Sequence, residues 1–65
     1  MADADLDAIR RAFVDLTCLF EDAALIASEG QGAETIQGGR LRFKRISKTM
    51  VRIQRRLVIL ERRLR

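Results

Sequence analysis

Basic side chains near the end of the sequence are the groups best suited to bind another molecule. They recur at intervals of three, four or seven residues, which places most of them along one stripe of a helix. At about 1.5 Å per residue the stripe is roughly 25 Å long, enough to contact several phosphates or a row of carboxylates. Most are arginines, whose guanidinium groups bind phosphate and carboxylate through paired hydrogen bonds. The candidate residues for binding an anionic partner are Arg45, Lys48, Arg52, Arg55, Arg56, Arg62 and Arg63.

The charge balance indicates that part of this stripe is not neutralised within the chain. Residues 1–29 hold seven acids against Arg10 and Arg11, a net charge of −5, whereas residues 40–65 hold eleven bases against Glu61, a net charge of +10. Glu34 supplies the remaining negative charge of a chain whose total is +4. A solvated helix face that pairs in part with the acidic segment is the simplest use of such charges. Because the acids are too few to cancel the bases, we also expect an anionic partner.

An acidic protein is the partner that we expect first, and DNA or RNA is the alternative. The basic segment has no Asn, carries Gln54 as its one amide after residue 39, and has no Trp or Tyr, so it lacks the side chains that read bases. Nucleic-acid binding would therefore depend on charge and shape rather than on sequence. Binding to a membrane surface is a distant third, because the apolar side of this segment has a matching partner within the same chain.

Catalytic chemistry is not expected. The sequence contains no His, and its single Cys, Cys18, has no second thiol with which to react. The carboxylates of Asp15, Glu21, Asp22 and Glu29 lack the spacing of metal ligands, and no glycine-rich phosphate loop follows a strand. We therefore predict a non-enzymatic protein without cofactor or metal. The lone thiol and the acidic N-terminal segment favour a cytoplasmic location.

Two apolar heptads predict the helices that carry these charges. Each repeats apolar residues at intervals of three and four, the pattern by which two helices pack side by side. We predict an all-α fold, an antiparallel two-helix hairpin with coiled-coil packing. The first heptad comprises Leu6, Ile9, Phe13, Leu16, Phe20, Ala23 and Ala27, and the second comprises Phe43, Ile46, Met50, Ile53, Leu57, Leu60 and Leu64.

The glycines place the bend of the hairpin. All four lie between residues 30 and 39, so we predict one helical-hairpin domain over 1–65, with helices at about 4–29 and 40–64 and a connector at 30–39. Asp3 and its neighbours would cap the first helix, and Gly30 would end it in a left-handed conformation. An earlier start of the second helix, capped by Thr35 and with Ile36 closing the core, is the alternative. The favoured start is near Gly39 or Arg40, because a glycine inside a helix costs about 1 kcal/mol.

The antiparallel register pairs large residues with complementary ones. It places Leu6 near Leu64, Phe13 near Leu57, Phe20 near Met50, Ala23 near Ile46 and Ala27 near Phe43. Small alanines would face large side chains at the connector end, as dense packing requires.

Apolar residues beyond these heptads predict self-association. A chain of 65 residues buries only about 60% of its unfolded surface, and it has neither a disulfide nor a metal to stabilise it. We therefore expect two hairpins to pair into a homodimeric four-helix bundle, or a higher oligomer. Val14, Cys18 and Leu25 form a separate apolar line, interpreted either as scattered surface residues or as a docking strip. The expected oligomer interface is Ala12, Leu19, Ile26, Val51 and Val58.

Overall fold

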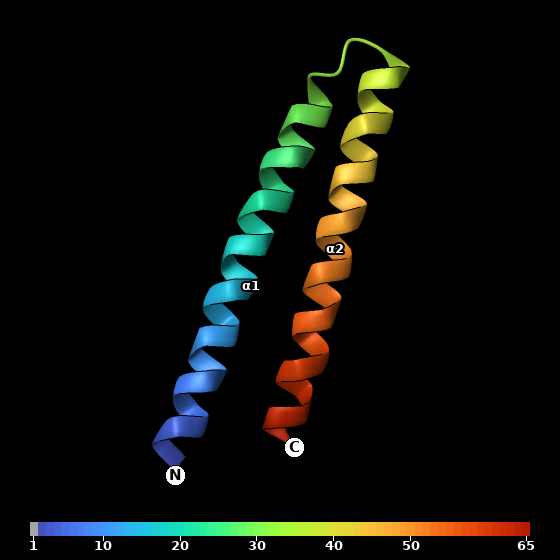
Figure 1. Ribbon diagram of the computed structural model, residues 1–65. Helices are drawn as coiled ribbons and strands as arrows, with labels where there is room; N and C mark the ends of the chain where they lie inside the picture. The colour runs from blue at the N-terminus through green and yellow to red at the C-terminus, as the bar shows by residue number, and fades with distance from the viewer. Residues whose placement is uncertain (1) are drawn as a thin grey trace.

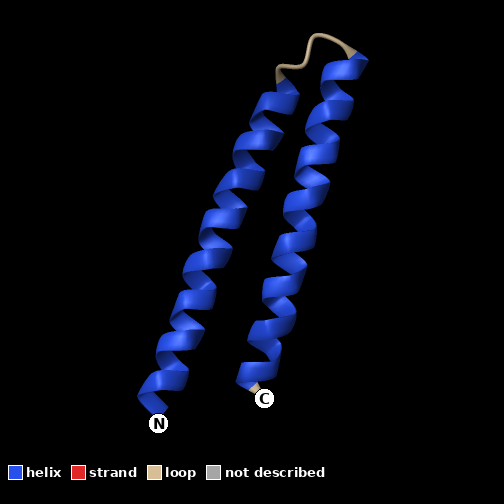
Figure 2. Cartoon of the chain, viewed as in Figure 1, coloured by secondary structure: helices blue, strands red, loops and turns tan. Residues whose placement is uncertain are grey.

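The chain folds into two antiparallel helices that lie side by side (Figure 1). The computed structural model describes residues 2–65, with side chains from Asp5 onward. Helix α1 spans Ala2–Gln31 and helix α2 spans Ile36–Leu64, and the described residues contain no strand (Figure 2). The predicted all-helical hairpin is confirmed. It is a rod of 53 × 15 × 10 Å with both chain ends at one end and the connector at the other.

Helix α2 begins earlier than the favoured start near residue 40, and the alternative at Thr35 is the one that the structure has. Thr35 is extended, with φ −136° and ψ 157°, and its Oγ1 accepts a hydrogen bond from the Gly38 amide at 3.0 Å. Its carbonyl accepts from the Gly39 amide at 3.1 Å. A threonine cap contributes about 1 kcal/mol, which offsets part of the cost of two helical glycines. Ile36 does not close the core, because it is 78% exposed.

Helix α1 continues through Gly30, so the left-handed stop predicted there is wrong. No glycine in residues 2–65 has a positive φ. The helix instead ends in tight turns, in which the Gly32 amide donates to the Glu29 carbonyl and the Ala33 amide to the Gly30 carbonyl, each at 3.1 Å. Such three-residue bonds satisfy carbonyls that the last helical turn leaves free. The predicted capping by Asp3 lies outside the described side chains, which begin at Asp5.

The core of the hairpin is one narrow stripe. Ile53 is its centre, at 1% exposure, and Leu16 and Leu60 pack around it. Thr49 is buried as well, and its Oγ1 donates a hydrogen bond to the Arg45 carbonyl at 3.2 Å. The hydroxyl is therefore satisfied within its own helix although it lies between α1 and α2. The other buried residues are Ala23 and Ile26, and Ile9, Ala12 and Leu19 pack partly against the core.

The axial register of the two helices agrees with the prediction, but their rotation does not. Ion pairs join Asp15 to Arg56 and Glu29 to both Arg42 and Arg45, and the residue numbers of these pairs add up to 71, 71 and 74, against 70 for most predicted pairs. The observed and predicted registers therefore agree to within about one helical turn. Phe13 and Phe20, which were expected in the contact, are about half exposed because α1 turns its Ala12, Leu19 and Ile26 side toward α2 instead. This rotation brings the acidic residues of α1 beside the arginines of α2.

Candidate interaction surfaces

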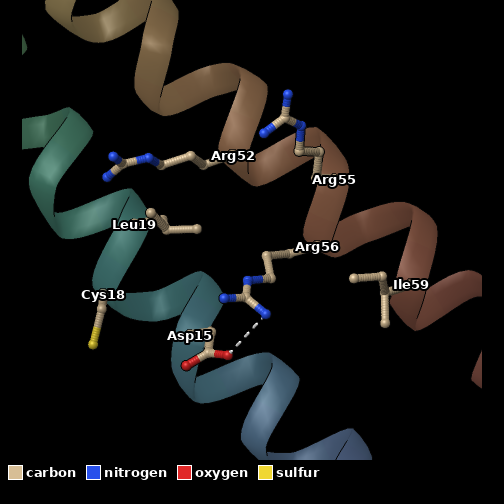
Figure 3. Close-up of a pocket in the computed structure, with 7 residues that line it drawn as sticks. All are labelled: Asp15, Cys18, Leu19, Arg52, Arg55, Arg56 and Ile59. Atoms are coloured by element: carbon tan, nitrogen blue, oxygen red, sulfur yellow. Dashed lines mark ion pairs between the residues drawn. The ribbon is translucent and has the colours of Figure 1, made fainter.

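The rotation gives the hairpin two unlike long faces, one charged and one apolar. On the charged face, Asp15, Asp22 and Glu29 recur every seven residues along α1, next to arginines of α2. A groove runs between the helices there. Its first hollow is lined by Asp15, Cys18, Leu19, Arg52, Arg55, Arg56 and Ile59 (Figure 3). Its second is lined by Asp22, Leu25, Ile26, Arg45, Lys48, Thr49 and Arg52. Because Arg52 lines both hollows, we treat them as one site, the arginine groove.

Ion pairs across the groove neutralise some of its arginines. Arg45 Nη1 lies 3.0 Å from Glu29 Oε1, and Arg56 Nη1 lies 3.5 Å from Asp15 Oδ2, as the dashed line in Figure 3 shows. Arg42 Nε is farther from Glu29 Oε1, at 3.9 Å. These side chains are partly exposed, so each pair contributes less than about 1 kcal/mol. Their main effect is to orient the two acids toward α2.

Three cations of the groove remain without such a partner. No carboxylate among the described side chains lies within 4.0 Å of the charged groups of Lys48, Arg52 or Arg55. Figure 3 shows Arg52 extending from α2 toward α1 near Leu19, whereas Arg55 points away from α1. The groove therefore combines apolar lining from Leu19 and Ile59 with uncompensated positive charge.

The structure brings together five of the seven predicted binding residues. Arg45, Lys48, Arg52, Arg55 and Arg56 all line the arginine groove. Arg62 and Arg63 lie instead in the last turn of α2, exposed and outside both hollows, where positive charge suits the helix dipole.

The opposite side of the hairpin carries a row of exposed apolar residues that sequence reasoning had placed in the core. Seven of them are large side chains that are 42–69% exposed. The seven-residue spacing within each helix was the signal for this row, but it could not say which side of each heptad meets the other helix. We call this row the open apolar face, which consists of Leu6, Phe13, Phe20 and Ala27 of α1 and Phe43, Met50, Leu57 and Leu64 of α2.

The residues expected at an oligomer interface are divided by the structure. Ile26 is 6% exposed, and Ala12 and Leu19 pack against the hairpin core, so these three contact α2 of their own chain. Val51 and Val58 are each 46% exposed on α2. Of the five residues expected at the interface, only Val51 and Val58 therefore remain free, and the predicted flank of α1 is used within the hairpin.

The remaining candidates are the apolar line of Val14, Cys18 and Leu25 and the acidic side chains. Cys18 is exposed, as are Val14 at 61% and Leu25 at 62%. Within the described residues, no three His, Cys, Asp or Glu side chains gather as they would around a metal ion. Neither α1 nor α2, as described, has a stretch long and apolar enough to cross a bilayer.

Comparison with known proteins adds no relative. No protein-family model, curated protein or solved structure matches this chain.

Proposed function

We propose that this protein is a non-enzymatic interaction module, a homodimeric four-helix bundle that presents its arginine grooves to an acidic protein partner. One observation carries the proposal. Lys48, Arg52 and Arg55 have no ion-pair partner among the described side chains, and they lie beside an apolar strip in a groove open along the hairpin. Charged groups around a small apolar centre are the usual composition of a protein-binding surface.

The lining of the groove favours a protein over a nucleic acid. A phosphate backbone laid along it would meet the carboxylates of Asp15 and Asp22 on the α1 side and would leave Leu19 and Ile59 without apolar contacts. An amphipathic helix with carboxylates beside an apolar stripe satisfies both parts. Its acids can pair with the free cations of α2 while its apolar side chains cover the strip.

The dimer is supported by the small size of the hairpin core. Only six described residues are buried, five of them hydrophobic, which is little for a domain that has no disulfide. Pairing of two hairpins would add a second apolar contact and leave both arginine grooves facing outward.

The test compares two anionic probes at two salt concentrations. One probe is a 20-residue helical peptide with Glu and Leu on one face, and the other is a 20-base-pair DNA duplex. Both carry the same fluorescent label. Binding is measured by fluorescence anisotropy at about 50 and 200 mM NaCl, because contacts with phosphates weaken steeply with salt. We expect the peptide to bind more tightly than the duplex at both concentrations. Tighter binding of the duplex, with no binding of the peptide, would replace this proposal by the nucleic-acid alternative.

A charge-reversal pair shows whether the groove is the binding site. Arg55→Glu should weaken peptide binding about tenfold, the equivalent of about 1.4 kcal/mol, with an unchanged circular dichroism spectrum. Arg40→Glu is the matched control, because Arg40 is exposed and lines neither hollow. Equal losses in the two variants would mean that the peptide senses only net charge.

A further inference from the structure

The open apolar face carries seven large apolar side chains that are 42–69% exposed, and none of the functions described so far uses it. We propose that it packs against the same face of a second copy, and that the connectors of the two copies lie at the same end of the bundle. This inference rests on the dimer of the proposed function and names its interface and its orientation.

The hairpin exposes more surface than a folded monomer of its mass is expected to expose. A folded monomer of 7.4 kDa is expected to expose about 4,200 Å², whereas this chain exposes 5492 Å². The excess is about 1,300 Å² per chain, so a dimer that covers it would bury about 2,600 Å² in total, within the range of obligate homodimers. A second copy carries the same open apolar face and the same excess of exposed area, so pairing covers both at once.

The open apolar face is divided into four layers along the rod. The ion pairs between the helices add up to 71, 71 and 74, so residues whose numbers add up to about 71 lie at equal height to within one helical turn. Each layer therefore has one residue from each helix, seven residues or about 10.5 Å from the next layer. A face-to-face partner would supply two more residues to every layer, as in a four-helix bundle. The layers are Leu6 with Leu64, Phe13 with Leu57, Phe20 with Met50, and Ala27 with Phe43.

Charge decides between the two ways of pairing such faces. With the connectors at opposite ends, each helix would lie beside its own copy, so that two basic segments 40–65, each of net charge +10, would be neighbours. Five of their cations line the arginine grooves on the outer side, so this repulsion acts at longer range than a direct contact. With the connectors at the same end, α1 of each copy lies beside α2 of the other, and residues 1–29, net −5, face the basic segment. Neighbouring helices are antiparallel in both arrangements. The second replaces repulsion by attraction and is the one we propose.

The residues bordering the open apolar face agree with this orientation. Next to it on α1 are Arg10 and Thr17, and at the same heights on α2 are Glu61 and Gln54, because each of these pairs also adds up to 71. In the same-end dimer Arg10 of one copy meets Glu61 of the other, and Thr17 meets Gln54. Within the hairpin, Arg10 has only the exposed Asp7, at 4.0 Å, for an ion-pair partner among the described side chains.

The face is tested with one glutamate substitution and a matched control. Phe20→Glu places a charge in a central layer, whereas Leu25→Glu places it on the arginine-groove side, and the two residues are 51% and 62% exposed in the hairpin. We expect light scattering to give the mass of two 7.4 kDa chains for the native protein and for Leu25→Glu, and of one for Phe20→Glu. A dimeric Phe20→Glu protein would show that copies associate through another surface.

The orientation is tested by disulfide crosslinking in a Cys18→Ser background, which removes the native thiol. Single variants Thr17→Cys and Gln54→Cys are oxidised separately and as an equal mixture, then separated on non-reducing gels, with a tag on one variant. In the same-end dimer the two Thr17 positions lie diagonally across the bundle, beyond the roughly 7 Å limit for Cα atoms in a disulfide. We therefore expect crosslinks only in the mixture. Crosslinking of each variant to itself would establish the opposite-end arrangement and overturn the inference.

These outcomes separate the inference from the proposed function. A native protein that scatters light as a monomer contradicts the dimer of both. A dimer with the wrong crosslinks, or one unaffected by Phe20→Glu, contradicts only the interface or its orientation. Failure of the acidic peptide to bind leaves the dimer results unaffected.

Discussion

Replacement of Ile53 by alanine should remove a large share of the stability of the hairpin. Ile53 is 1% exposed at the centre of the contact between α1 and α2, so the truncation leaves a cavity that rigid helices cannot close. Isoleucine-to-alanine changes at such sites cost about 2–5 kcal/mol. A domain of 65 residues has about 3–10 kcal/mol of stability in total, at roughly 0.05–0.15 kcal/mol per residue. We expect a loss near the middle of the first range, and Ile53→Asp should unfold the chain because it would bury an unpaired charge.

The matched control is the same substitution at Ile36, which is 78% exposed. Ile36→Ala should change the free energy of unfolding by no more than about 0.5 kcal/mol, as surface substitutions usually do. Urea unfolding followed by circular dichroism at 222 nm gives both values, at one protein concentration because association adds stability. Similar losses for Ile53→Ala and Ile36→Ala would refute the assignment of the hairpin core to the stripe centred on Ile53.

Three further substitutions test the local structure, all measured by urea unfolding at fixed protein concentration. Thr35→Ala removes the oxygen that accepts the Gly38 amide at 3.0 Å, and should cost about 1 kcal/mol; an unchanged midpoint would contradict the cap. Gly39→Ala should instead add about 0.5–1 kcal/mol, because Gly39 is helical and nothing lies within 4 Å of the added methyl group; a loss would mean that this turn is not helical. Glu29→Gln weakens the pair with Arg45, and should cost less than about 1 kcal/mol at 50 mM NaCl and still less at 500 mM; a loss that does not depend on salt would exclude a screened ion pair as its cause.

The sequence was sufficient to predict the hairpin, its bend and its axial register. Each follows from a pattern with a direct physical cause. Two apolar heptads predict the two helices, glycines confined to one segment predict the bend, and segments of similar length on either side of the bend predict the register. The register could be derived because the helices must start their contact at the bend, as the pair of Glu29 with Arg42 shows.

The rotation of the helices could not be derived, because both have an apolar arc wider than one contact. Phe13 and Leu19 are both apolar, and periodicity does not say which of them faces α2. The choice depends on Thr49, a polar residue that packs in the core because its hydroxyl bonds to its own helix, and on acids that gain arginine neighbours. The start of α2 was likewise predicted too late, because two helical glycines are costly. The hydrogen bond from the Gly38 amide to Thr35, which offsets part of that cost, belonged to the less favoured alternative. The sequence predicted the α2 residues of the arginine groove but not those that α1 contributes, because these depend on the rotation of the helices.

The location of both chain ends at one end of a 53 Å rod decides what a fusion to this protein would do. A domain joined to either end emerges beside α1 and α2 at the end opposite the connector, so it leaves the residues around Thr35 uncovered. In the same-end dimer all four chain ends meet there, and domains fused to the two copies are held close together. Their local concentration then rises to the millimolar range typical of short tethers, without any contact between the fused domains themselves. With the connectors at opposite ends, the same fusions would be kept the length of the rod apart.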